Sequence, residues 1–181
     1  MDLNEQYLEY NILENTNHLY LETDFYFSFP QVFLRFKNIK KLEIIGCRWS
    51  NLNCNQIPIY VEHLILTYTI LPSDIMKGAE NLINLQNLEL NINPFFGYHS
   101  GLILYESYGN SGSKDEDDDI HPIPDLGNLK YVSFDISEQD IDKIIDDNVY
   151  KKIIQKHKLF ENIKNRISNI NIEDTKLIIN L

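Results

Sequence analysis

A recurring spacing of apolar residues is the feature that most restricts how this chain can fold. Six segments align on a central apolar residue that is followed two places later by a second one: Leu19/Leu21, Leu42/Ile44, Leu64/Leu66, Leu88/Leu90, Val132/Phe134 and Ile170/Ile172. In each segment a residue of the type Asp, Cys, Thr, Asn or Ser stands five places after the centre. Neither a helical period nor simple strand alternation accounts for this pattern. It predicts a repeat architecture in which each segment forms one coil.

Two further columns precede the central residue. Three places before it stand Ile39, Val61, Leu85, Leu129 and Ile167. Six places before it stand Leu13, Phe36, Leu82 and Leu126, while two segments have their apolar residue one place earlier, at Ile57 and Ile163. We expect both columns to point into a shared core, because each coil can bury its apolar face only against its neighbours.

The distances between central residues set the domain organisation. The first four are separated by 23, 22 and 24 residues, and the next two intervals are 44 and 38. This predicts a single domain over 1–181 with regular coils and two insertions, since a chain of 181 residues is about one domain. The expected strands are near 18–22, 41–45, 63–67, 87–91, 131–135 and 169–173.

The polar residues that end each segment have a structural explanation. Where a coil turns away from its strand, inward-facing backbone groups lose their ladder partners, and an unpaired buried amide costs about 1–3 kcal/mol. A small polar side chain can bond to those groups. We therefore expect a corner ladder formed by Asp24, Cys47, Thr69, Asn93, Ser137 and Thr175.

These motifs resemble the leucine-rich repeat, whose signature is LxxLxLxxN/CxL. The segment "IPIYVEHLIL" is also similar to the core of FNIP-type repeats of amoebae and giant viruses, although the Phe-Asn of that variant does not follow it. The resemblance implies an α/β leucine-rich-repeat solenoid. Its short parallel β-sheet would form the concave face, with helices and irregular segments on the convex face.

The remaining segments are interpreted from their composition. Residues 1–17 are expected to form a helical cap, and 138–166 a helical insertion, because Ile141, Ile144 and Ile145 recur at helical spacing. Residues 94–124 form an insertion with a solvated acidic loop at 114–119, and whether 102–107 adds a strand stays open. Little sequence follows the last repeat at "KLIINL" to cover its apolar side, which predicts self-association at this C-terminal edge.

Charge and composition exclude several classes of partner. A net charge of −11 argues against nucleic acid, because binding a phosphate backbone depends on clustered Lys and Arg. No apolar run reaches the roughly 18 residues of a membrane span. Two cysteines are too few for a disulfide framework, and the start of the chain does not resemble a signal peptide, which indicates a cytoplasmic or nuclear setting.

We find no pattern typical of catalysis or of cofactor binding. The seven glycines form no phosphate-binding loop, and the five histidines show no metalloprotease spacing. Cys47, Cys54 and His63 could be considered as zinc ligands, but a fourth ligand is not evident. His18 and His63 share one repeat column and are expected to line the sheet. The sequence therefore predicts no enzyme activity, no metal and no cofactor.

The face of the sheet opposite the core is the predicted binding surface. Aromatic residues among carboxylates on a rigid sheet favour a protein partner with a basic or amphipathic segment. The predicted contact residues are Tyr20, Glu22, Glu43, Ile45, Ile65, Thr67, Tyr68, Glu89, Asn91, Tyr131, Ser133 and Asp135, with Asn171 and Glu173 on the last repeat. The sequence thus predicts a non-enzymatic protein-interaction module. The alternatives are a substrate-recognition subunit of a ubiquitin ligase-type complex and a structural, self-associating repeat protein.

Overall fold

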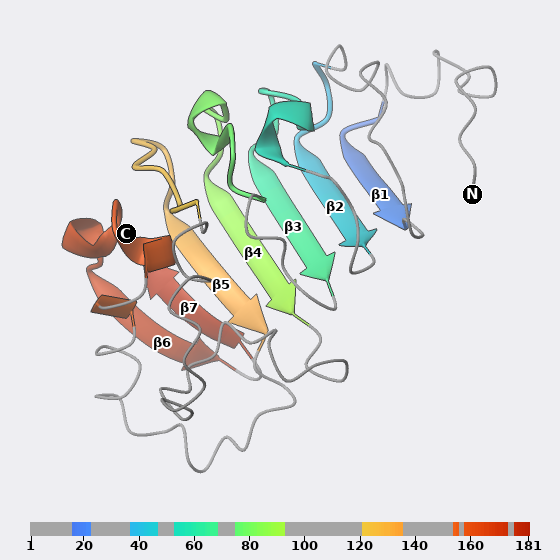
Figure 1. Ribbon diagram of the computed structural model, residues 1–181. Helices are drawn as coiled ribbons and strands as arrows, with labels where there is room; N and C mark the ends of the chain where they lie inside the picture. The colour runs from blue at the N-terminus through green and yellow to red at the C-terminus, as the bar shows by residue number, and fades with distance from the viewer. Residues whose placement is uncertain are drawn as a thin grey trace, which may run out of the picture.

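The described residues form a mixed seven-stranded sheet with few helical residues, an α/β-like class (Figure 1). It is seen in a computed structural model that describes residues 16–22, 37–46, 53–68, 75–92, 121–135, 154–155, 158–173 and 176–181. The strands are β1 (His18–Glu22), β2 (Lys41–Gly46), β3 (His63–Tyr68), β4 (Asn87–Ile92), β5 (Tyr131–Asp135), β6 (Asn169–Glu173) and β7 (Lys176–Asn180). Six of them fall on the ranges that the repeat alignment names.

The first five strands lie side by side in chain order and are all parallel. Their register follows the repeat columns: Leu19 pairs with Leu42, Leu42 with Leu64, Leu64 with Leu88, and Leu88 with Val132. A slip of one residue would turn every apolar side chain to the opposite face. The matched columns therefore produce continuous apolar rows across these strands.

The last two strands depart from the expected parallel row. The terminal segment "KLIINL" contains β7, which inserts between β5 and β6 and pairs antiparallel with both (Figure 1). Ile170 therefore contacts Ile179 in place of Val132, and Ile179 continues the central row. The wholly parallel sheet was a wrong expectation, and the segment that was expected to leave the last repeat uncovered lies inside the sheet. At this end β6 is the outermost strand.

A repeated backbone contact sets the register where each strand begins. The Asn17 carbonyl accepts hydrogen bonds from the N–H groups of Lys40 and Lys41, at 2.8 and 2.9 Å. The carbonyls of Lys40, Glu62 and Gln86 each accept two N–H groups of the following coil in the same way, at 2.7–3.4 Å. The next carbonyl in this series, that of Lys130, accepts a hydrogen bond from the N–H of Leu181, at 2.8 Å. The C-terminal strand therefore occupies the place of a further coil.

The core lies on one face of the sheet and is closed by the segments that return between strands. The inward residues of β2 to β5 and β7 are buried, as is the column formed by Ile39, Val61, Leu85 and Leu129. Ile57 and Ile163, the two residues displaced by one place in the alignment, are also buried. On β1 and β6 the inward Leu19, Ile170 and Ile172 are only partly buried. The sheet therefore has a well-packed middle and two more open ends.

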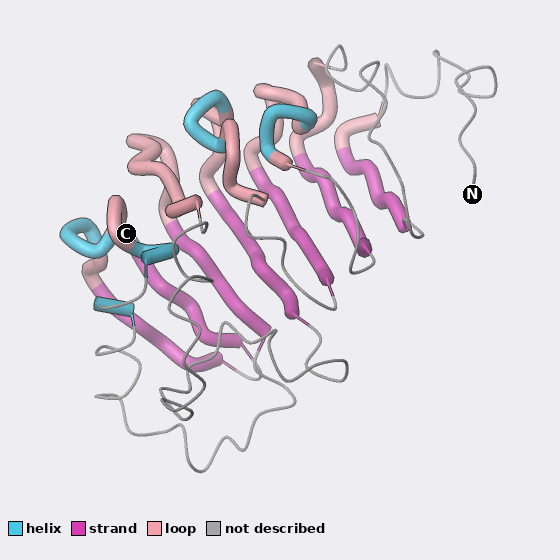
Figure 2. The backbone as a smooth tube through the Cα atoms, viewed as in Figure 1, coloured by secondary structure: helices cyan, strands magenta, loops and turns pink. Residues whose placement is uncertain are grey.

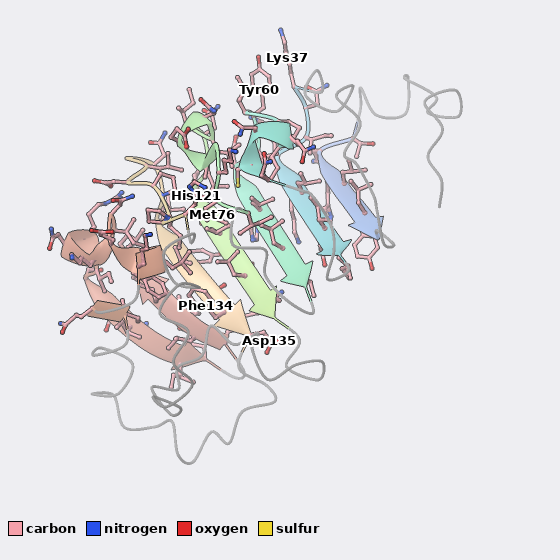
Figure 3. All side chains as sticks on the ribbon, viewed as in Figure 1. Lys37, Tyr60, Met76, His121, Phe134 and Asp135 are labelled. Carbon is pink, nitrogen blue, oxygen red and sulfur yellow. The ribbon has the colours of Figure 1, made fainter. Side chains whose placement is uncertain are left out.

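The described parts of the returning segments are built mainly from turns and short 3₁₀ helices (Figure 2). The 3₁₀ helices are η3 (Cys54–Gln56), η4 (Ala79–Asn81), η6 (Lys158–Phe160) and η7 (Lys164–Arg166). The segment "PSDIMKGAENLI" is expected from its apolar spacing to form a short helix. Its described part, 75–82, instead forms turns around η4, since Gly78 takes a left-handed φ of 84° that an α-helix does not accommodate. Lys37 and Tyr60, labelled in Figure 3, mark the turns before β2 and β3.

An asparagine column in these turns joins neighbouring coils. The side-chain amide of Asn84 donates to the carbonyl of Ile59, and that of Asn128 donates to the carbonyl of Ile83, both at 2.8 Å. Both asparagines stand four residues before the central residue of their strand. Arg166 has the same position in the last repeat and binds Asp125, at 2.6 Å, together with two carbonyls of the turn before β5. This ladder was not among the features predicted from the sequence.

Several expectations concern residues outside the described part of the chain. They are the whole corner ladder (Asp24, Cys47, Thr69, Asn93, Ser137 and Thr175), most of the 1–17 cap, the acidic loop at 114–119 and most of the 138–166 insertion. The described part of that insertion, from 154 onward, contains a two-residue helical stretch at 154–155 and the 3₁₀ helices η6 and η7.

Gly78 provides a test of the packing between coils. A Cβ at this position would lie 2.1 Å from Asn55 Oδ1 of the preceding coil, and the left-handed φ adds a strain of about 1–2 kcal/mol for a residue with a side chain. We expect Gly78→Ala to lower the free energy of unfolding by about 1–2 kcal/mol in urea titrations. Gly127→Ala is the matched control, because its Cβ meets nothing within 4 Å and should cause no loss. Equal stabilities of the two variants would contradict this packing.

Candidate functional site on the open face of the sheet

The face opposite the core, which we call the open face, carries three rows of side chains from alternate strand positions. Strand register places them side by side across the sheet. The first row is His18, Lys41, His63, Asn87, Tyr131, Asn180 and Asn169; the second is Tyr20, Glu43, Ile65, Glu89, Ser133, Ile178 and Asn171; the third contains Ile45, Thr67, Asn91, Asp135, Lys176 and Glu173. Most of these residues are polar, as expected for the solvent side of a sheet with one buried face.

Glu89 is the centre of a charged network on this face. Its Oε1 lies 2.6 Å from Nε2 of His63 on β3, and its Oε2 lies 2.5 Å from Nζ of Lys176 on β7. The Glu89 side chain is 9% exposed, and Tyr131 meets His63 edge-on with ring centroids 6.5 Å apart. Because β5 lies between β4 and β7, the Glu89–Lys176 contact spans a whole strand.

The network holds Glu89 in its ionised form. The hydrogen bond from His63, together with the contacts of Lys176, lowers the pKa of the Glu89 carboxyl from 4.5 to about 2 and outweighs the opposing effect of burial. The bond to Glu89 in turn raises the pKa of Lys176, and burial raises the pKa of the Tyr131 hydroxyl. Near neutral pH all three groups keep their charge state, so Glu89 is poorly suited to act as a general acid or base.

Ser133 lies on β5 beneath this strand-spanning contact. It is the register partner of both Glu89 and Ile178, and it is fully buried although its side chain points away from the core. Within the described residues its hydroxyl has no hydrogen-bond partner. A buried, unpaired hydroxyl costs about 1–3 kcal/mol. A substrate could not reach this oxygen without displacing the Glu89 network.

The half of the open face formed by β1 to β3 is more accessible. Tyr20 is 51% exposed, and His18 and Glu43 form a looser pair at 3.7 Å. This pair repeats the geometry of His63 and Glu89, because each histidine contacts the glutamate that stands diagonally on the next strand. The same diagonal His–Glu pair is therefore exposed to solvent at one end of the sheet and largely buried near the middle.

The predicted contact residues thus fall into two groups. Tyr20, Glu43, Ile45, Thr67, Asn91, Tyr131 and Asp135 are exposed or partly exposed, whereas Ile65, Glu89 and Ser133 are buried. The last three cannot contact a partner in this arrangement, because neighbouring side chains cover them. Glu22 and Tyr68 lie on strands, but their side chains are outside the described set. Lys176, which the sequence analysis did not select, completes the network from the segment "KLIINL".

Two of the three candidate metal ligands, Cys54 and His63, lie on opposite faces of the sheet, and Cys47 is outside the described residues. Cys54 is buried in the core, where burial raises the pKa of its thiol to about 12 and keeps it neutral. His63 binds Glu89 on the opposite face. Within the described ranges no cluster of three His, Cys, Asp or Glu residues could hold a metal ion, and no helix there is long and apolar enough to cross a bilayer.

Comparisons with known proteins return no relative. No family model, no curated protein and no solved structure matches this chain.

The depressed pKa of Glu89 predicts how acid affects the protein. Because the folded-state pKa is below the unfolded value, the stabilisation by Glu89 is complete above pH 4.5 and is lost as pH falls toward about 2. We expect Glu89→Gln to lower the free energy of unfolding by about 1–3 kcal/mol at pH 7. The difference from wild type should shrink over the same acidic range in urea titrations.

Glu62→Gln serves as the control for this experiment. Glu62 forms an exposed ion pair with Lys40 at 2.8 Å, and such pairs contribute less than about 1 kcal/mol. A stability difference between wild type and Glu89→Gln that did not change between pH 7 and pH 2 would contradict the assigned network.

The unpaired hydroxyl of Ser133 predicts that its removal, unlike the substitution of Glu89, does not lower the free energy of unfolding. Ser133→Ala removes a buried polar group without creating a large cavity, so we expect the free energy of unfolding to stay equal or to rise by up to about 1 kcal/mol. Chemical denaturation at pH 7 measures this change. A loss of more than about 1 kcal/mol would mean that the hydroxyl makes a stabilising hydrogen bond.

Proposed function

We propose that the chain is a non-enzymatic protein-interaction module, a short leucine-rich-repeat solenoid that binds a partner protein through its open face. Support for the solenoid comes from the five parallel strands in matched register and from the carbonyl contact that recurs at 23-, 22-, 24- and 44-residue intervals, from Asn17 to Lys130. A coil that contacts only its neighbours is the defining property of such arrays.

The accessible half of the open face is the proposed contact surface. It combines the exposed Tyr20 and His18 with the partly exposed Glu43, Lys41 and Thr67 on three adjacent strands. An aromatic side chain on a rigid strand loses little conformational freedom on binding, and a nearby carboxylate selects a cationic group. The proposed partner therefore presents a basic or amphipathic segment.

The chemistry of the Glu89 network is consistent with a structural role for the other half of the face. Its carboxylate is already satisfied by His63 and Lys176, and Ser133 is covered. Replacing these contacts by a partner would leave a desolvated charge, which costs several kcal/mol. We therefore place binding on β1 to β3, with the β4, β5 and β7 region serving as a rigid support.

A paired-variant experiment tests this proposal. Tyr20→Ala combined with Glu43→Lys should abolish capture of the partner in affinity purification from the native cell, while the melting temperature stays within a few degrees of wild type. The control Ile83→Ala combined with Glu161→Lys makes equivalent changes at two exposed positions outside the strands and should retain the partner.

The captured partner should also dissociate more readily as salt is raised, because exposed charge pairs are screened. Equal recovery of the partner by the two double variants would rule out this surface. Turnover of a substrate by the purified chain would contradict the assignment as a non-enzymatic module.

A further inference from the structure

We infer that the outer edge of β6 is a second docking surface, distinct from the open face, that takes an extended segment of a partner protein carrying a large aliphatic residue with a carboxylate on the same side. Strand addition of this kind uses backbone hydrogen bonds for affinity and side-chain cavities for selectivity. Both features meet at β6.

The first feature is an unpaired backbone edge. Leu181 donates to the Lys130 carbonyl on the β5 side, so the alternating residues Ile179 and Leu177 also face β5, and Asn180, Ile178 and Lys176 face β6. Their register partners on β6 are Asn169, Asn171 and Glu173. Ile170 and Ile172 therefore direct their N–H and C=O groups to the outer edge, where no described strand pairs with them.

Asn169 partly covers this edge in the free protein. Its Oδ1 accepts a hydrogen bond from the outward N–H of Ile170, and its Nδ2 donates to Asn171 Oδ1, both at 2.8 Å. A side chain that caps an edge N–H competes with an incoming strand for the same donor. Removing the cap should thus favour docking.

The second feature is a cavity of about 230 Å³ that opens beside the strand. Ile154, Ile167 and Ile170 form its apolar lining, and Lys164 and Asn169 are among its polar residues. Cavities for drug-sized ligands are roughly 300–1,000 Å³, so this one suits one or two side chains rather than a whole small molecule. The inward Ile170 and Ile172 are only partly buried here, so a partner residue would complete their packing.

Charge selects the occupant. The chain has a net charge of −11, yet Lys164 lies exposed at the cavity, and the described residues provide it with no carboxylate partner. A second copy is disfavoured, because two chains of −11 repel each other. A five-residue edge is also only about 17 Å long, too short to bury the roughly 1,200 Å² that stable dimers need. A carboxylate-bearing segment of a partner protein therefore fits this edge better than a second copy of the chain does.

The probe is a fluorescein-labelled heptapeptide, Thr-Asp-Thr-Ile-Thr-Asp-Thr. It reads the same in both chain directions and places Ile and both Asp side chains on one face of a strand. Its control replaces both Asp by Lys. Non-specific attraction to an acidic chain would favour the Lys peptide, so preference for the Asp peptide can arise only from a local site. By fluorescence anisotropy we expect the Asp peptide to bind at least about tenfold more tightly.

Three variants locate the site. Lys164→Glu should lower the affinity for the Asp peptide by about threefold to tenfold, whereas the same charge change at the exposed Lys77 should lower this affinity less. Ile172→Pro, which removes an outward N–H without touching the β7 ladder, should abolish binding that Ile172→Val retains. Asn169→Ala should tighten binding by about fivefold, since no cap has to be displaced.

Three results would overturn this inference. They are equal affinities for the two peptides, equal effects of Lys164→Glu and Lys77→Glu, and self-association of Asn169→Ala in sedimentation experiments, which would make a second copy the occupant. Lys164→Glu changes an exposed side chain, so its result stands even where Ile172→Pro fails to fold. The open-face variant Tyr20→Ala/Glu43→Lys should bind the Asp peptide normally, which separates this surface from the proposed function.

Discussion

The carbonyl that precedes each of the strands β1 to β4 makes the contact on which the rest of the structure depends. At Asn17, Lys40, Glu62 and Gln86 one oxygen accepts two N–H groups from the next coil, which fixes both the start and the register of the following strand. Once the register is fixed, side-chain alternation directs the apolar residues to one face and the polar residues to the other. The core and the open face are therefore two consequences of one backbone constraint.

The same constraint explains why the two halves of the open face differ. Aligned strands place a histidine diagonally opposite a glutamate both at His18–Glu43 and at His63–Glu89. Only the second pair receives Lys176 from β7, which closes over Ser133 and removes Glu89 from solvent. The two parts of the open face have similar residues in the sequence. The strand β7 makes one of them inaccessible to a partner and leaves the other accessible.

Much of the fold could be predicted from sequence because its signals are periodic. The apolar columns identified six strands and the buried positions Ile57 and Ile163, since each repeat presents the same pattern to its neighbours. The strand β7 could not be found this way. It has no preceding turn columns, and it pairs antiparallel inside a parallel array. The burial of Glu89 was equally hidden, because Lys176 lies 87 residues away in the chain. Asn84 and Asn128 did give a signal, four residues before their strand centres, but asparagine is common enough here to obscure it.

The placement of β7 between β5 and β6 is the most direct test of the account, because the Glu89 network and the free edge of β6 both follow from it. Nuclear Overhauser contacts between Hα protons report antiparallel neighbours at positions that are not hydrogen-bonded to each other. The structure predicts such contacts between Ser133 and Ile178 and between Ile170 and Ile179. Direct contacts between the backbones of Val132 and Ile170, as in an uninterrupted parallel row, would contradict it.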